Sequence, residues 1–211
     1  MSGSRPSARW VAVLVAAALL LAGAFAARAA PPRLATDKQI AAATVQLTKL
    51  RVAAPLSERG YSREKFPHWD STGQGCDTRD AILKRDAIRA RVGAECRILG
   101  GIWRDPYGGT RTHDPHSLDI DHLVPLANAW RSGARRWTTA RRETYANDPR
   151  GLLAVNAGLS RQKGDDGPEQ WLPPRVAFQV TYAVRWVGVK ARYRLSVTRL
   201  EKSALGGLLT R

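Results

Sequence analysis

The sequence predicts an α+β fold in which helices surround a small group of strands. Strand-like runs rich in aliphatic residues lie in the middle of the chain, at 97–103, 118–124 and 152–155. Apolar residues recur every three or four positions in the flanking regions, most clearly from Pro174 to Tyr193, as in amphipathic helices. With 211 residues and a single pair of cysteines, the chain is long enough for one domain with a real core.

The N-terminal residues 1–29 have the pattern of a cleaved export signal. Arg5 and Arg9 form a basic start, an apolar run follows from Trp10 to Phe25, and Ala27-Arg28-Ala29 is an Ala-x-Ala cleavage site. The run is shorter than the roughly 20 residues that span a bilayer, so cleavage is favoured over a signal anchor. We therefore expect secretion, with no stable membrane insertion after cleavage.

The mature domain expected at 30–211 is strongly basic. The whole chain carries 34 Lys and Arg against 18 Asp and Glu, a formal net charge of +16. Removal of the leader takes away three arginines and no acids, which leaves 31 basic and 18 acidic residues and a charge of +13. Such an excess points to an anionic partner such as nucleic acid, anionic lipid or an acidic cell-wall polymer, unless all proteins of the organism are rich in arginine.

The two cysteines are interpretable once export is assumed. Cys76 and Cys96 enclose nineteen residues, and an isolated pair in an oxidising compartment usually forms a disulfide. We expect a Cys76–Cys96 bond. Because the chain has no Cys-x-x-Cys spacing, a thiolate zinc site is not expected.

Capping residues and proline set the limits of the predicted helices. The helices are expected at 37–51 after Thr36 or Asp37, at 79–90 after Asp77 or Thr78, as one turn at 126–130 after Pro125, at 139–146 after Thr138 or Thr139, at 174–193 from Pro174, and after Thr198, which begins a capping-box pattern. The proline- and glycine-rich residues 54–75 are expected to form a loop. Histidines in loops, His68, His113 and His116, are more often structural than catalytic, and their spacing is weak support for a metal site.

The predicted strand at 118–124 is followed by Pro125 and carries Asp121 and His122, whose side chains we expect at its solvent-facing end. A carboxylate beside an imidazole combines a hard oxygen ligand with a group that titrates near neutrality, as in metal-assisted hydrolases. The alternative is that Asp121 caps a turn and His122 packs in the core. The pair by itself leaves both interpretations open.

An ordered set of motifs extends this pair along the chain. It comprises Gly75-Cys76-Asp77-Thr78-Arg79, Cys96, Gly101-x-Trp103, Asp119-Ile120-Asp121-His122-Leu123-Val124-Pro125-Leu126-Ala127, Trp130-x-Ser132-Gly133-Ala134, Ala146-Asn147-Asp148, Leu153-Ala154-Val155, Lys163-Gly164-Asp165 and Glu169-x-Trp171-Leu172-Pro173. The set resembles the secreted HNH endonuclease family proteins, which are related to the C-terminal domain of GmrSD-type restriction endonucleases. The resemblance implies a ββα-metal core wrapped by additional helices, with the polar run from Ser160 to Asp165 opening the helix.

The resemblance also implies roles for particular residues. His122 matches the general base, Asp121 matches a catalytic metal ligand, and Arg161 and Lys163 match phosphate-binding residues, joined here by the exposed Arg141 and Arg142. The implied cofactor is a divalent metal, Mg²⁺ or alternatively Mn²⁺. The implied reaction is phosphodiester hydrolysis of nucleic acid, DNA rather than RNA, with low sequence specificity.

Two positions depart from the family pattern. Ser160 stands where the family commonly has Asn as the second metal ligand, and Gly151 stands near the position of the Asn that orients the loop. Asn156 lies on the same connection and could replace either one. These departures leave two alternatives to an active nuclease: a catalytically weakened nuclease fold that binds nucleic acid, and a basic protein attracted to acidic envelope polymers.

Overall fold

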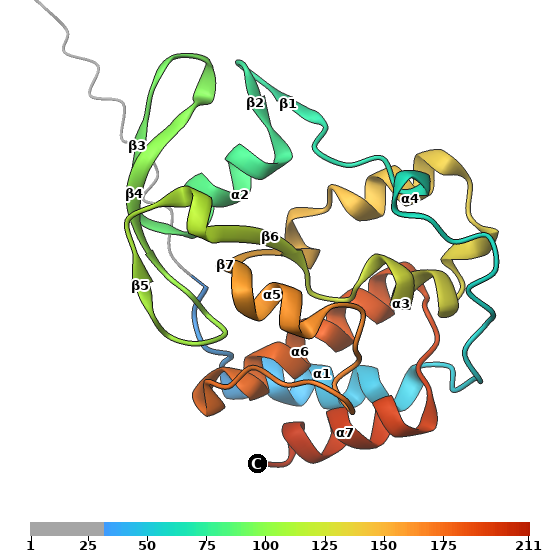
Figure 1. Ribbon diagram of the computed structural model, residues 1–211. Coiled ribbons are helices and arrows are strands. Elements are labelled where there is room, and N and C mark those ends of the chain that lie inside the picture. Colours follow the sequence, from blue (N-terminus) through green and yellow to red (C-terminus); the bar gives the residue numbers. More distant parts are fainter. Residues whose placement is uncertain (1–31) are drawn as a thin grey trace, which may run out of the picture.

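The computed structural model describes residues 32–211, so the predicted signal peptide at 1–29 lies outside the described residues (Figure 1). The helices are α1 (Asp37–Lys49), α2 (Thr78–Asp86), α3 (Leu126–Arg131), α4 (Thr139–Ala146), α5 (Ala157–Lys163), α6 (Val176–Tyr193) and α7 (Arg199–Leu209). The strands are β1 (Ser71–Gly73), β2 (Cys76–Asp77), β3 (Ala87–Val92), β4 (Ile98–Arg104), β5 (Arg111–Thr112), β6 (Leu118–His122) and β7 (Leu152–Asn156). The chain is therefore α+β, as predicted.

Helices α1, α6 and α7 pack together on one side of the molecule, and the antiparallel sheet β3-β4-β5 lies on another (Figure 1). The antiparallel pair β6-β7 lies between these parts, with α5 packed against both strands. The order of elements in this central unit is therefore strand, strand and helix, as the sequence predicts.

The β6-β7 pair separates two hydrophobic clusters. Leu118 and Leu152 face the smaller cluster, which also contains Trp103, while Leu153 faces the larger cluster around α6. Alternate residues of a strand point to opposite faces, so Asp121 shares the face of Leu153 and His122 shares the face of Leu118. Burial on both faces explains why β7 reads as an uninterrupted apolar run.

The helix predicted at 79–90 is confirmed up to Asp86 and is wrong in its last four residues, 87–90. Helix α2 ends at Asp86, whose buried carboxylate pairs with Arg85 and accepts a hydrogen bond from the backbone N–H of Ala154 at 2.9 Å. The next residues, Ala87–Val92, form β3 and pair with β4. This long-range pairing overrides the local helical pattern, and Ile88 and Val92 are β-branched residues that favour a strand.

The polar run from Ser160 also lies differently from the prediction. Helix α5 begins at Ala157, because the Asn156 side chain caps it by accepting from the Leu159 N–H at 3.0 Å. Ser160 to Lys163 therefore form the second half of the helix. Gly164 ends it with a φ of +51°, a conformation that suits glycine.

The predicted disulfide is confirmed. Cys76 and Cys96 are bonded, with Cα atoms 4.9 Å apart, and they join β2 to the turn before β4.

Replacing both cysteines by serine should lower the free energy of unfolding by about 3 kcal/mol, because the bond restricts a short loop of the unfolded chain. Urea denaturation of the oxidised wild type and the double variant measures this difference. Equal midpoints and slopes would show that the bond contributes no stability.

Candidate functional site

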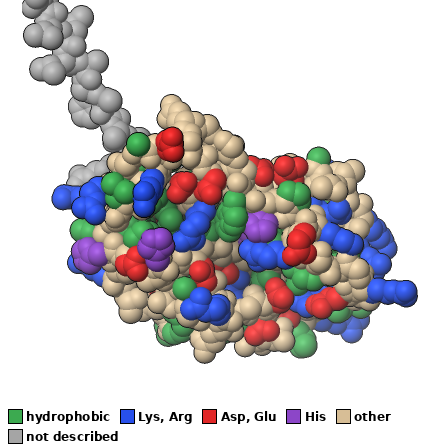
Figure 2. Space-filling view, turned by 45° about the horizontal axis from the view of Figure 1, so that its top comes forward, with side chains coloured by type: hydrophobic (Ala, Val, Ile, Leu, Met, Phe, Trp, Pro, Cys, Tyr) green, Lys and Arg blue, Asp and Glu red, His purple; other side chains and the backbone are tan. Residues whose placement is uncertain are grey.

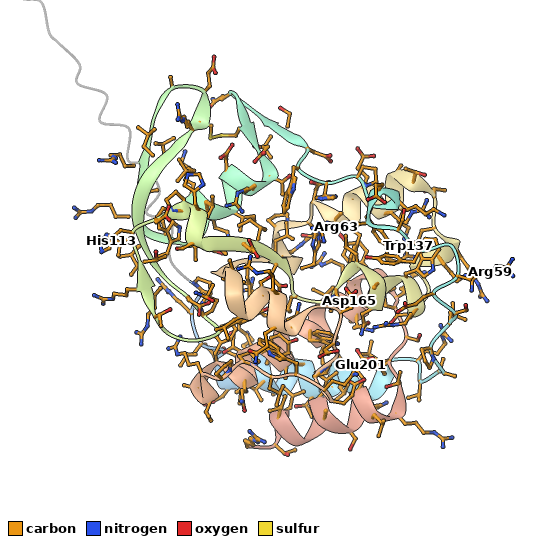
Figure 3. All side chains as sticks on the ribbon, in the orientation of Figure 1. Arg59, Arg63, His113, Trp137, Asp165 and Glu201 are labelled. Atoms are coloured by element: carbon orange, nitrogen blue, oxygen red, sulfur yellow. A yellow bond between two sulfur atoms is a disulfide. The ribbon has the colours of Figure 1, made fainter. Side chains whose placement is uncertain are left out.

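A pocket of about 380 Å³ opens where β6, α5 and the loop before β1 meet. Its lining residues are Arg63, Trp69, Arg79, Asp119, Ile120, Asp121, His122, Pro125, Leu126, Ser160, Arg161, Gly164 and Asp165. Figure 3 labels two of them, Arg63 and Asp165. The structure thus brings Asp121, His122, Ser160 and Arg161 to one pocket, as the sequence predicts.

Asp121 is buried and fully engaged by its neighbours. The Lys163 ammonium donates to its two carboxylate oxygens at 2.9 and 2.8 Å, and the Tyr107 hydroxyl donates to Oδ2 at 2.6 Å. Burial and the adjacent carboxylate raise the pKa of Tyr107 well above its usual value, so this hydroxyl keeps its proton. Asp121 is only 7% exposed and His122 6%, so the expectation that β6 presents them to solvent is wrong.

Lys163 does not lie where a phosphate-binding lysine is expected. Its side chain is fully buried, and its ammonium also donates to the backbone carbonyl of His122 at 2.9 Å. An ammonium has three N–H donors, and these three contacts use all of them. The expectation that Lys163 contacts phosphates directly is therefore wrong. The positive charge of Lys163 neutralises the buried carboxylate of Asp121 instead.

His122 makes one hydrogen bond and lies near three rings, those of Tyr145, Trp69 and His68. Its Nε2 lies 2.9 Å from the carbonyl oxygen of Ala146, its ring is nearly parallel to Tyr145 at 6.5 Å, and the tilted Trp69 ring lies 6.3 Å away. Burial lowers the pKa of His122 to about 3, and the nearby positive charges of Arg63 and Lys163 act in the same direction. The ring is neutral at physiological pH. Because a carbonyl only accepts, Nε2 carries the proton and Nδ1 carries the free lone pair.

The other predicted site residues are divided between the pocket and other places. Ser160 lies beside Asp121, with its Oγ 3.5 Å from Oδ1, and Arg161 is exposed at the rim, 3.7 Å from Asp119. Asn156 pairs with Leu118 at the opposite end of β6-β7 from His122, caps α5, and is not among the lining residues of the pocket.

Arg141 and Arg142 lie on α4 and do not line this pocket. Arg141 donates to the Tyr193 carbonyl at 3.1 Å and lies over the Trp137 ring, and Arg142 donates to the carbonyls of Lys65 and Trp137. Their guanidinium groups therefore support the packing of α4.

A closed protein cage for a metal is absent from residues 32–211, since they contain no cluster of three or more His, Cys, Asp or Glu side chains that could hold an ion. Mg²⁺, however, commonly takes one or two carboxylates and completes its shell with substrate phosphates and water. A carboxylate has about four lone-pair positions, of which Lys163 and Tyr107 occupy three. The fourth, on Oδ1, accepts a hydrogen bond from the Ser160 hydroxyl at 3.5 Å, the longest of these contacts. A cation bound between Oδ1 and Ser160 Oγ would replace this contact. The donor set therefore fits a weakly held, oxygen-loving cation.

Three residues of the site carry no recognisable sequence signal. Tyr107 orients Asp121 from a distant segment, and Arg63 and Trp69 come from the loop predicted at 54–75. Only their position in the folded chain identifies them. Ala146 belongs to the recognised motif Ala146-Asn147-Asp148, but its contact with His122 is seen only in the structure.

The basic excess is not collected into one stripe on the face shown in Figure 2, where Lys and Arg alternate with Asp and Glu. Charge alone therefore does not locate the binding surface on this face.

Comparisons with known proteins show the family of the chain. Residues 77–208 match the family described as GmrSD restriction endonucleases, C-terminal domain. An "Uncharacterized secreted protein" of Arthroderma benhamiae is 45% identical over 166 residues, which cover 77% of this chain and 81% of that protein. No solved structure matches. In the described part of the chain, no helix is both long and apolar enough to cross a membrane.

Substitution of Lys163 by Met should lower the free energy of unfolding by about 3 kcal/mol, because it leaves Asp121 buried without its counter-charge. Lys38→Met, on the exposed surface of α1, is the matched control and should change stability by less than about 0.5 kcal/mol. Chemical denaturation of both variants measures the difference. Equal stability of the two variants would contradict the importance of the buried pair.

Proposed function

Because the chain belongs to the family of GmrSD restriction endonuclease C-terminal domains, we propose that it is a secreted, metal-dependent endonuclease of the HNH type. In this proposal β6, β7 and α5 are the ββα-metal core, and the pocket around Asp121 and His122 is the active site. The observation that carries the proposal is the placement of a neutral, fixed imidazole beside a carboxylate in an open pocket.

His122 is proposed as the general base. Its Nε2 proton is committed to Ala146, so Nδ1 is the nitrogen that can take a proton from a water molecule in the pocket. The rings of Tyr145 and Trp69 hold the imidazole in position. The base therefore needs no reorientation before the reaction.

Asp121 and Ser160 are proposed as the protein ligands of Mg²⁺ or Mn²⁺. The metal would stabilise negative charge on the phosphate that is cleaved and on the oxygen that leaves. Lys163 fixes the Asp121 carboxylate from the buried side. Its positive charge repels a metal ion bound to the same carboxylate and so weakens metal binding. We therefore expect a metal requirement at high rather than trace concentrations.

Nucleic acid is the proposed substrate, DNA before RNA. Arg161 is exposed at the pocket rim and can reach a backbone phosphate, a contact that carries no sequence information. The name of the Arthroderma benhamiae relative and the export signal pattern support an extracellular location.

A second candidate function is binding without cleavage. It is favoured by the Lys163 contacts to both Asp121 oxygens and by Ser160 in place of an amide ligand. Incubation of the mature chain with plasmid DNA and Mg²⁺, with and without EDTA, separates the two. Cleavage that EDTA abolishes supports the nuclease, whereas tight binding without cleavage supports the alternative.

His122→Ala should lower the cleavage rate by about 10²- to 10⁴-fold, the usual contribution of a general base. DNA affinity should stay nearly unchanged, because a neutral imidazole adds little to phosphate binding. His116→Ala, which changes an exposed histidine outside the pocket, is the control and should cleave like the wild type. A His122→Ala variant that is folded and fully active would overturn the assignment.

A further inference from the structure

The pocket takes two lining residues, Arg63 and Trp69, from a segment that precedes the family-matched residues 77–208. Arg63 begins the turn Arg63–Lys65 and Trp69 follows that turn, while α5 contributes Ser160 and Arg161 to the same pocket. The matched residues therefore leave one wall of this pocket to another part of the chain.

The residues that follow the turn Arg63–Lys65 are anchored to the rest of the domain. Phe66 is fully buried between the rings of Trp130 and Tyr145, at centroid distances of 6.3 and 6.1 Å. The Asn147 amide donates to the Pro67 carbonyl at 3.0 Å and accepts from the Asp70 N–H at 3.1 Å. The backbone on both sides of Trp69 is thus fixed by one side chain.

Trp69 has a left-handed backbone conformation, with a φ of +67°. For a bulky residue this is unusual and costs about 1–3 kcal/mol. The indole lies 6.3 Å from the His122 ring, and the two ring planes are tilted by 32°. The surrounding contacts keep Trp69 in this strained conformation at the wall of the pocket, which indicates that the conformation serves a function.

Arg63 differs from the other two arginines of the pocket. Arg79 donates to the carbonyls of Pro115 and Leu118, and Arg161 lies near Asp119. Arg63 is exposed and, within residues 32–211, its guanidinium has no hydrogen bond or ion pair. A free guanidinium at the mouth of a pocket presents a planar set of donors that matches a phosphate.

We infer that the segment from Arg63 to Trp69 is a substrate-binding arm of the active site. Arg63 binds a backbone phosphate of the nucleic acid strand that enters the pocket, and Trp69 is a positioning residue that holds the His122 ring. The inference rests on the proposed function and extends it to residues outside the family-matched region.

The Arg63 contact is tested by binding of a fluorescent single-stranded oligonucleotide in EDTA, followed by anisotropy at several salt concentrations. Arg63→Ala should weaken binding about tenfold and lower the slope of log K against log salt by about 0.7, the value for one phosphate contact. Arg59→Ala is the matched control, since Arg59 points outward at the edge of the molecule (Figure 3) and should change affinity less than about twofold.

If the Arg63→Ala and Arg59→Ala variants bind identically while the wild type binds and cleaves, the substrate-binding arm is contradicted but the proposed nuclease function is not. A wild type that neither binds nor cleaves nucleic acid would remove the proposed function and the arm together.

The role of Trp69 is tested by Trp69→Asn, because asparagine tolerates the left-handed conformation and removes only the ring. The variant should lose about tenfold in kcat with little change in KM or melting temperature, and Trp69→Phe should recover most of kcat. Unchanged kcat in Trp69→Asn, or a loss that Trp69→Phe does not recover, would contradict a positioning role.

Discussion

The buried ion pair between Asp121 and Lys163 is the interaction on which the site depends. Burial of either charge alone is costly, and the Lys163 ammonium has its three donors placed on the two Asp121 oxygens and the His122 carbonyl. Helix α5 therefore cannot shift along β6 without leaving a buried charge unsatisfied. This constraint sets the position of Ser160, one turn earlier on α5, beside Asp121.

A second buried ion pair joins helices α6 and α7. Lys190 on α6 is fully buried and pairs with Glu201 on α7, with further contacts to Asn128 and Ser132 around α3. The two buried lysines thus connect α5 to β6 and α6 to α7, and each must be matched by its carboxylate for the elements to pack. The pocket lies beside the first of these pairs, where a rigid floor supports side chains that need fixed positions.

Patterns that depend on local spacing could be predicted from the sequence. The caps at Thr36, Thr138 and Thr198, the strands around Asp121 and Leu153, and the pairing of the two cysteines are all confirmed. Two features could not be predicted from the sequence: the change from α2 to β3 at Ala87 and the burial of Lys163. Each depends on a partner far away in the sequence. Trp69 and Arg63 were missed for the same reason.

The central claim is that Asp121 Oδ1 can bind a metal on the side that faces Ser160, while Lys163 and Tyr107 keep their hydrogen bonds to the rest of the carboxylate. Anomalous diffraction from crystals soaked in Mn²⁺ measures this directly. The account predicts one peak in the pocket between Asp121 Oδ1 and Ser160 Oγ, with Lys163 still paired to Asp121. A peak elsewhere in the molecule, or no peak in crystals of a chain that cleaves DNA with Mn²⁺, would contradict it.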